Sequence, residues 1–225
     1  MNTVAQLSPS LNTRQALPVF YMEGGESSSM SSIAQFLDSQ QISTLEFAPW
    51  IDAFPYKPIV RFSIAYSQTS IHLKFFVEER TVRAATTDIN GPVWEDTCVE
   101  FFFSFDGGHY YNLEFNCTGT ALVGYGSSKA DRKLLPAQII QTIDTYCLIQ
   151  NKPGNENRYW ELTLSIPLTL FIYTPTEILK GKQYLANFYK CGDLLPEPHF
   201  LCWKNIEYPE PNFHLLKCFG VLDFK

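Results

Sequence analysis

The sequence predicts an all-β protein: an antiparallel β-sandwich of the jelly-roll or immunoglobulin-like kind, with a short N-terminal helix and long proline-rich loops. The chain of 225 residues is 45% hydrophobic, enough for a sizeable core, and 15% aromatic, a composition that favours strands. Much of the chain alternates apolar and polar residues with the period of a half-buried strand. Turns rich in Gly, Pro and Asn separate these runs, and no long helical repeat lies between them.

The N-terminal part of the chain predicts one short helix. Residues 1–30 indicate a loose segment that ends in the Gly/Ser-rich stretch EGGESSSMSS. Ile33, Phe36 and Leu37 then follow at the i, i+3, i+4 spacing of one helix face. We therefore expect a helix near 31–40.

The remaining chain, 43–225, predicts a single sandwich domain, on which residues 1–42 pack as an arm. Alternation is clearest in SIHLKFFVEE and YWELTLSIP. The proline-rich segment 193–214 cannot be a central strand and indicates a long ordered loop, a type of segment that often carries function. The expected strands are 59–66, 70–79, 97–105, 109–117, 119–125, 138–149, 159–167, 183–190 and 218–224.

The sequence VEFFFSFDGGHYYNLEF predicts a hairpin with a three-residue turn, Asp106-Gly107-Gly108. A two-residue turn would bring polar side chains into the apolar row, so burial selects the longer turn. In this register Glu100 lies directly opposite Glu114 on one face, beside Asn112 and Asn116. The other face is apolar and predicts core residues: Val99, Phe101, Phe103, Leu113 and Phe115.

The opposed carboxylates Glu100 and Glu114 need either compensation or solvent, because like charges directly opposite destabilise a sheet. A cation, an Arg or Lys, a shared proton or a polyhydroxyl ligand would compensate; on a solvated outer face, water would screen the pair. The neighbouring amides favour a hydrogen-bonding platform. Trp94 and Trp203 lie in predicted loops, where each would either stack on a sugar or pack under its loop.

Five segments, taken in order along the chain, carry a family resemblance: KPIVRFSIAYSQTSIHLKFFVEE, GPVWEDTCVEFFFSF, YYNLEFNCTGT, LANFYKCGD and PHFLCWKNIEYPEPNFH. With these segments the chain resembles carbohydrate-binding modules of family 9, and more closely their stand-alone members. The resemblance covers about 45–225. It implies a non-catalytic β-sandwich that clamps a terminal sugar between two Trp rings and binds structural calcium. Trp94 and Glu100 match the first Trp and the following acid of the family's slot, Trp203 is the expected second Trp, and Phe200 stands where an amide is expected.

We therefore expect a mono- or oligosaccharide as partner and a binding site of Trp94, Glu100, Asn112, Glu114 and Trp203. One alternative is a protein-interaction sandwich that has lost the sugar slot. The other is a glycoside hydrolase, because retaining enzymes need two carboxyl groups about 5 Å apart. The position of the two acids in mid-strand speaks against hydrolysis. A haem with Met and His ligands is unexpected, because all three Met lie in the N-terminal arm.

Charge and composition exclude further classes. The net charge of −6 speaks against a nucleic-acid-binding surface, which needs a basic face. The sequence contains no run of 18 apolar residues, so we expect no membrane span. The N-terminus lacks the apolar core of a signal peptide, so the expectation is a cytoplasmic protein. Six Cys without CxxC spacing favour buried reduced thiols over disulfides and give little support to zinc. No cofactor is required; a structural calcium would find acidic loop residues in Asp96, Asp106 and Asp193, but metal ligands stay unknown.

Overall fold

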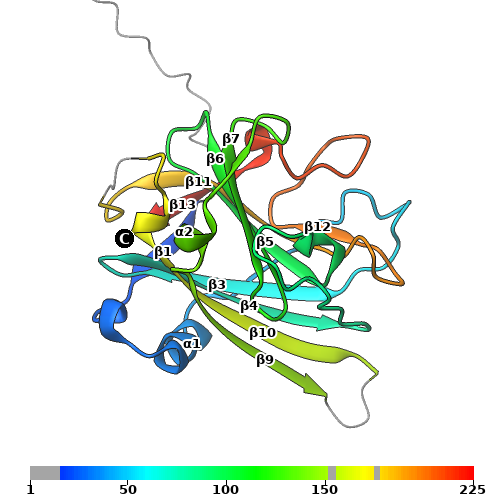
Figure 1. Ribbon diagram of the computed structural model, residues 1–225, viewed down its shortest axis with the longest axis horizontal. Helices are drawn as coiled ribbons and strands as arrows, with labels where there is room; N and C mark the ends of the chain where they lie inside the picture. The colour runs from blue at the N-terminus through cyan, green and yellow to red at the C-terminus, as the bar shows by residue number, and fades with distance from the viewer. Residues whose placement is uncertain (1–15, 152–155, 175–177) are drawn as a thin grey trace, which may run out of the picture.

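Two sheets that cross face to face form the fold of the computed structural model, which describes residues 16–151, 156–174 and 178–225 (Figure 1). The first sheet has the order β8 (Lys133–Leu134), β7 (Ala121–Gly126), β6 (Tyr110–Asn116), β5 (Cys98–Ser104), β11 (Gln183–Cys191) and β13 (Gly220–Phe224). The second has the order β3 (Ile59–Tyr66), β4 (Ser70–Glu79), β10 (Arg158–Pro167) and β9 (Asp144–Asn151). Two short strands extend them: β2 (Ser43–Thr44) pairs with β3, and β12 (Phe200–Cys202) pairs with β11. The predicted all-β sandwich is confirmed.

A strand that the sequence did not predict joins the two sheets. The first part of β1 (Leu17–Tyr21) pairs in parallel with β13, and its last two residues pair in parallel with β3. Leu17 and Val19 are buried, whereas Phe20 is exposed. The prediction of a loose segment is therefore wrong for this strand, which is too short and too weakly alternating to be recognised without its partners.

Helices are few and short. The α1 helix (Met30–Asp38) confirms the helix expected near 31–40; it buries Ile33 and Leu37 against the outer face of the second sheet. The other helical segments are α2 (Ala137–Ile140) and the single turns Gly25–Ser27, Val93–Glu95, Leu168–Leu170 and Leu216–Cys218. None of the helices in the described part of the chain has the length and apolar character that a membrane-spanning segment needs.

The strand predicted over 138–149 is wrong in its first half. Residues 137–140 form α2, which begins after Pro136, and β9 starts at Asp144. Proline carries no N–H and its fixed φ suits the start of a helix. Ile139 and Ile140 therefore belong to a helical turn and not to the expected strand, and the helix buries the side chain of Ile140.

The hairpin has the predicted register. Glu100 pairs with Glu114 and Phe101 with Leu113, while Gly107 adopts the left-handed φ of 72° in the turn. The turn is closed by Asp106, whose Oδ1 accepts hydrogen bonds from two backbone N–H groups at 2.8 Å each. The five residues predicted to form the apolar row are fully buried in the core between the sheets: Val99, Phe101, Phe103, Leu113 and Phe115.

The outer face of the first sheet carries a second apolar cluster, covered by the loops around residues 47–56 and 193–219. Its largest members include Trp50, Phe102, Tyr110, Tyr189, Phe213 and Phe219. The hairpin face that bears the two acids belongs to this side and is also covered, since Glu100 is 4% and Glu114 3% exposed. The alternative of a solvated outer face is therefore wrong, and the two acids need partners from the protein or from a ligand.

Candidate functional site

A cavity of about 190 Å³ opens over the outer face of the β5–β6 hairpin. Three of the predicted site residues line it: Trp94, Glu100 and Glu114. The rest of the lining comes from loops and from the end of β11: Lys129, Arg132, Cys191, Asp193, Phe200, Pro211, Asn212, Phe213 and His214. Aromatic rings, both signs of charge and an amide thus face one small space, which is the usual make-up of a small-molecule site.

Glu114 is held by two donors. Its Oε1 accepts a hydrogen bond from Asn112 Nδ2 at 2.9 Å and an ion-paired one from Arg132 Nη1 at 3.0 Å. Asn112 is fully buried and is not among the cavity-lining residues, so it positions Glu114 from beneath. Gly124 makes room for this amide, because a Cβ there would lie 2.6 Å from Asn112 Oδ1. One of the predicted compensations for the paired acids, an arginine, is therefore present.

Glu100 has a different environment. Its Oε1 lies 3.1 Å from Cys191 Sγ, a weak thiol donor, and no amide or guanidinium bond to it is found among the described residues. Burial raises the pKa of Glu100 well above its ordinary value, and the charge of Glu114 adds to the rise. Burial also raises the pKa of Glu114, but Arg132 and Asn112 oppose this. Of the two acids, Glu100 is thus the one on which the protein favours a proton.

Two further titratable side chains face the cavity. Burial raises the pKa of Asp193 to about 6, against the opposing charge of Lys129. Burial and the positive charges of Arg132 and Lys129 lower the pKa of His214 to about 3, so its imidazole is neutral at pH 7. The ring is fixed by a 2.9 Å hydrogen bond between its Nδ1 and Tyr110 OH.

Trp94 lies where the sequence predicted, half-buried at the cavity wall. It belongs to the helical turn Val93–Glu95, and its carbonyl oxygen accepts a hydrogen bond from Asp193 N at 3.0 Å. This bond ties the turn to the end of β11. The Trp94 ring is therefore presented by a loop that is anchored on both sides of the cavity.

Trp203 does not join Trp94, and the prediction that both rings line one slot is wrong. Trp203 is 9% exposed and packs in the core between the sheets, with ring centroids 6.0 Å from Phe62 and 5.6 Å from Phe188. The cause is β12, since Trp203 N continues the pairing with β11 by donating to Phe188 O at 2.9 Å. The aromatic rings that the proline-rich segment brings to the cavity are Phe200 and Phe213.

The acidic loop residues named for calcium lie in different settings. Asp96 is fully buried and accepts bonds from Arg83, from Asn116 and from two backbone N–H groups. Asp106 closes the hairpin turn, and Asp193 lines the cavity. Asn116, whose amide was expected to flank the paired acids, therefore donates a hydrogen bond to Asp96 and does not line the cavity. A structural calcium stays a prediction.

The predicted reduced thiols are largely confirmed. All six cysteines are free, and Cys98, Cys117, Cys191 and Cys202 are buried. Cys147 is exposed, because it lies on the edge strand β9.

The comparison with known proteins decides the family. A family model described as carbohydrate-binding family 9 matches residues 31–224. The chain belongs to this family. A solved structure from Bacteroides uniformis, provisionally named a carbohydrate-binding protein, is 35% identical, with a TM-score of 0.87 over 95% of this chain and 100% of that one.

Two sugar complexes share the family 9 fold at low sequence identity. A family 9 carbohydrate-binding module from Caldicellulosiruptor kristjanssonii in complex with glucose is 10% identical, with a TM-score of 0.60 over 94% of this chain and 96% of that one. The module in complex with cellotriose is 9% identical, with a TM-score of 0.58 over 94% of each chain. Among curated proteins, no sequence matches this chain.

The loop cations at the cavity were not among the predicted site residues. Lys129 and Arg132 belong to the basic stretch KADRK, which follows the strand next to the hairpin. Because β7 pairs antiparallel with β6, a loop that leaves β7 returns beside Glu114. That order of strands is the signal from which an arginine partner could have been inferred. No such local signal points to His214, which reaches the cavity from the far end of the proline-rich segment.

Proposed function

We propose that the protein binds a carbohydrate without cleaving it and holds one terminal sugar residue in the cavity over the hairpin. The observation that carries the proposal is the convergence of the Trp94 ring with Glu100, Glu114 and Arg132 in one space of about 190 Å³. This is smaller than the roughly 300–1,000 Å³ of pockets that hold drug-sized ligands. A single pyranose ring is the ligand class that suits both the size and the mixture of groups.

The roles of the lining residues follow from their chemistry. The Trp94 ring offers an apolar face to the C–H groups of a sugar, and Phe200 and Phe213 replace Trp203 as the other apolar surfaces. Glu114 and Arg132 are fixed by their mutual bond and present an acceptor and donors to the hydroxyl groups. Glucose and cellotriose, bound by modules of the same fold, are the first ligands to test.

Calorimetric titration with glucose, cellotriose and a panel of other mono- and oligosaccharides tests this function. We expect the wild type to bind at least one of them, and Trp94→Ala and Glu114→Gln to weaken binding about tenfold or more, the cost of one lost hydrogen bond or stacking contact. Tyr146→Ala is the matched control, because this exposed aromatic lies on β9, on the other sheet.

Two results would contradict the proposal. Absence of binding by the wild type at millimolar sugar would leave a protein-interaction sandwich. Release of shorter sugars from the same mixtures would identify a hydrolase, and Glu100→Gln would then abolish that release.

A further inference from the structure

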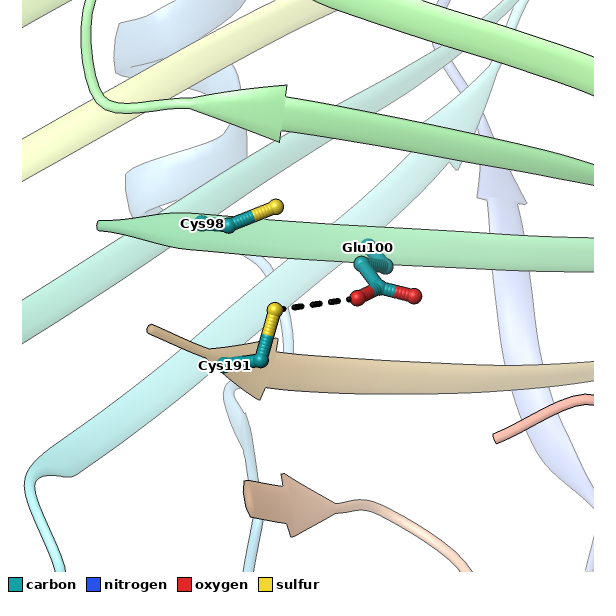
Figure 2. Close-up of side chains that lie close together, drawn as sticks. All are labelled: Cys98, Glu100 and Cys191. Carbon is teal, nitrogen blue, oxygen red and sulfur yellow. Dashed lines mark hydrogen bonds between the residues drawn. The ribbon is translucent and has the colours of Figure 1, made fainter. Parts of the chain in front are cut away.

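Three side chains with metal-binding chemistry converge beside the cavity: Cys98, Glu100 and Cys191. Each offers one ligand atom, and the three atoms lie within 4.8 Å of one another. Figure 2 shows Cys191 and Glu100 pointing toward each other from neighbouring strands, with Cys98 on the same strand as Glu100. All three are buried, with exposed fractions of 0, 4 and 2% for Cys98, Glu100 and Cys191.

The register of two adjacent strands creates this cluster. Cys98 of β5 and Cys191 of β11 are direct partners in the antiparallel ladder. Glu100 follows Cys98 by two residues, so its side chain lies on the same face of the sheet. Donors placed by strand register are held by the backbone hydrogen bonds of the sheet, and a site on such rigid elements is more precise than one on loops.

The environment of Glu100 is the second observation that indicates a ligand. A carboxyl group so deeply buried holds a charge only with a charged or strongly donating partner, because an unpaired buried charge costs free energy. Glu114 has Arg132, but the hydrogen-bond partner found for Glu100 in the described chain is the Cys191 thiol, at 3.1 Å. A cation bound between the two thiols and this carboxylate would supply the missing compensation.

We propose that Cys98, Cys191 and Glu100 bind one Zn²⁺ ion, with the fourth coordination position open to the cavity. In a tetrahedral zinc site, bond lengths of about 2.3 Å to sulfur and 2.0 Å to oxygen place two sulfurs about 3.8 Å apart and sulfur and oxygen about 3.5 Å apart. In the metal-free protein the three donor atoms lie within 4.8 Å of one another, and Cys191 Sγ is 3.1 Å from Glu100 Oε1, so small side-chain rotations bring them to this spacing. Glu100 and Cys191 line the cavity, so the open position is accessible to water or to a ligand hydroxyl.

The donor set selects the class of metal. Thiolates prefer zinc and other soft ions, whereas Ca²⁺ takes six to eight oxygen ligands and Mg²⁺ keeps oxygen ligands and water. When Zn²⁺ binds, the two thiols and the Glu100 carboxyl group release their protons to solvent. The bound cluster then has a net charge of −1, from two thiolates, one carboxylate and the 2+ ion. The neighbouring Lys190 donates to the Cys191 carbonyl oxygen at 2.8 Å, while its Nζ is also ion-paired with Glu79 at 3.0 Å.

Titration of the reduced, chelator-stripped full chain with Co²⁺ under anaerobic conditions tests the proposal, without any need for sugar binding. We expect one equivalent of Co²⁺ to produce the thiolate-to-metal charge-transfer and d–d absorption of a tetrahedral site, and Zn²⁺ to displace it. Zn²⁺ at about 100 times its Kd should raise the melting temperature by about 5–10 °C.

Variants separate the proposed site from other thiols. Cys98→Ser and Cys191→Ser should each lower Co²⁺ affinity about 100-fold or more, and Glu100→Gln about tenfold or more. Cys202→Ser, which changes a buried thiol outside the cluster, and Cys147→Ser, which changes an exposed one, should retain wild-type affinity. These controls distinguish loss of a ligand from general damage to the fold.

Three results would overturn the proposal. The first is that the reduced wild-type chain does not develop the Co²⁺ absorption. The second is that Cys98→Ser and Cys191→Ser retain this absorption. The third is that Cys202→Ser and Cys147→Ser lose it as much as the two cluster variants do. If the reduced chain does not bind Co²⁺ and air oxidation joins Cys98 to Cys191, the pair is a redox pair and the zinc proposal is wrong.

Discussion

The ion pair between Arg132 and Glu114 should stabilise both the fold and the cavity, and Arg132→Met tests this. The substitution keeps most of the side-chain volume and removes the charge. Arg132 Nη1 and Glu114 Oε1 are 3.0 Å apart, and their side chains are 16% and 4% exposed. The pair is therefore more buried than the surface pairs that contribute about 0–1 kcal/mol.

The magnitude can be bounded from this distance. At 3.0 Å the Coulomb energy is about 1.4 kcal/mol in water and about 5.5 kcal/mol at an effective dielectric constant of 20. Desolvation of both groups reduces the net gain, and hydrogen bonds to charged groups contribute about 1.5–3 kcal/mol. We expect Arg132→Met to lower the free energy of unfolding by about 2 kcal/mol at pH 7.

The assay is urea unfolding of the wild type, Arg132→Met, Glu114→Gln and the double variant. The double-mutant cycle should give a coupling energy of about 1–3 kcal/mol, because the two side chains bond directly. Asn112 remains in every variant and continues to donate to position 114, so the cycle reports the pair. A coupling energy below about 0.5 kcal/mol would refute the reasoning and show that solvent screens this pair.

Three further predictions concern other parts of the molecule. Trp203→Ala should cost about 3–5 kcal/mol of stability, because this ring packs in the core on Phe62 and Phe188; a loss below 1 kcal/mol in urea unfolding would place it outside the core. Gly124→Ala should weaken sugar binding, because its Cβ would lie 2.6 Å from Asn112 Oδ1 and displace the support of Glu114; unchanged calorimetric affinity would contradict this. Burial lowers the pKa of His72 from 6.5 to about 4, against the charge of Glu26, so the unfolded chain binds more protons between these values and stability rises with pH across that window. The depressed pKa lowers the free energy of unfolding by about 2 kcal/mol at pH 5 and by about 3 kcal/mol at pH 4. His72→Gln should therefore reduce the rise in the free energy of unfolding between pH 4 and 6.5 by about 2.5 kcal/mol; an unchanged slope would refute this.

The hairpin was predictable because burial decides its register locally. One residue of slip would have moved Asn112 and Glu114 into the apolar row, so the alternation of apolar and polar residues selects one pairing. The same argument placed Glu100 and Glu114 opposite each other. The alternation could not show that loops cover the face with Glu100 and Glu114. Residues 193–219 form much of this cover, and they lie far from the hairpin in the sequence.

Long-range pairing also explains two of the errors of placement, those at β1 and at Trp203. The strand β1 is defined by parallel partners about 200 residues away in β13 and by β3, and its own five residues hold little periodicity. Trp203 lies in a proline-rich segment that predicts a loop, yet three residues of that segment pair with β11 and direct the next side chain into the core. Local composition identified the loop but not the direction of its tryptophan ring.

The cysteines illustrate the same limit for a chemical site. Spacing along the chain argued against zinc, because no two cysteines form a CxxC pair. Cys98 and Cys191 become partners only through the pairing of β5 with β11, which no local pattern in the sequence specifies.

The two opposed acids differ in what stabilises them, and this difference is informative about function. Burying an acid costs free energy, which Glu114 recovers through Arg132 and Asn112. Glu100 is equally buried, but a thiol is a weak donor and offsets little of that cost. A leucine of similar size would suit the surrounding apolar cluster better if stability alone determined the residue. Glu100 is therefore a position where the demands of folding are poorly satisfied, and residues of that kind concentrate at functional sites. Both proposals place a ligand there: a sugar hydroxyl group from the cavity side, and a metal ion from the side of the two thiols.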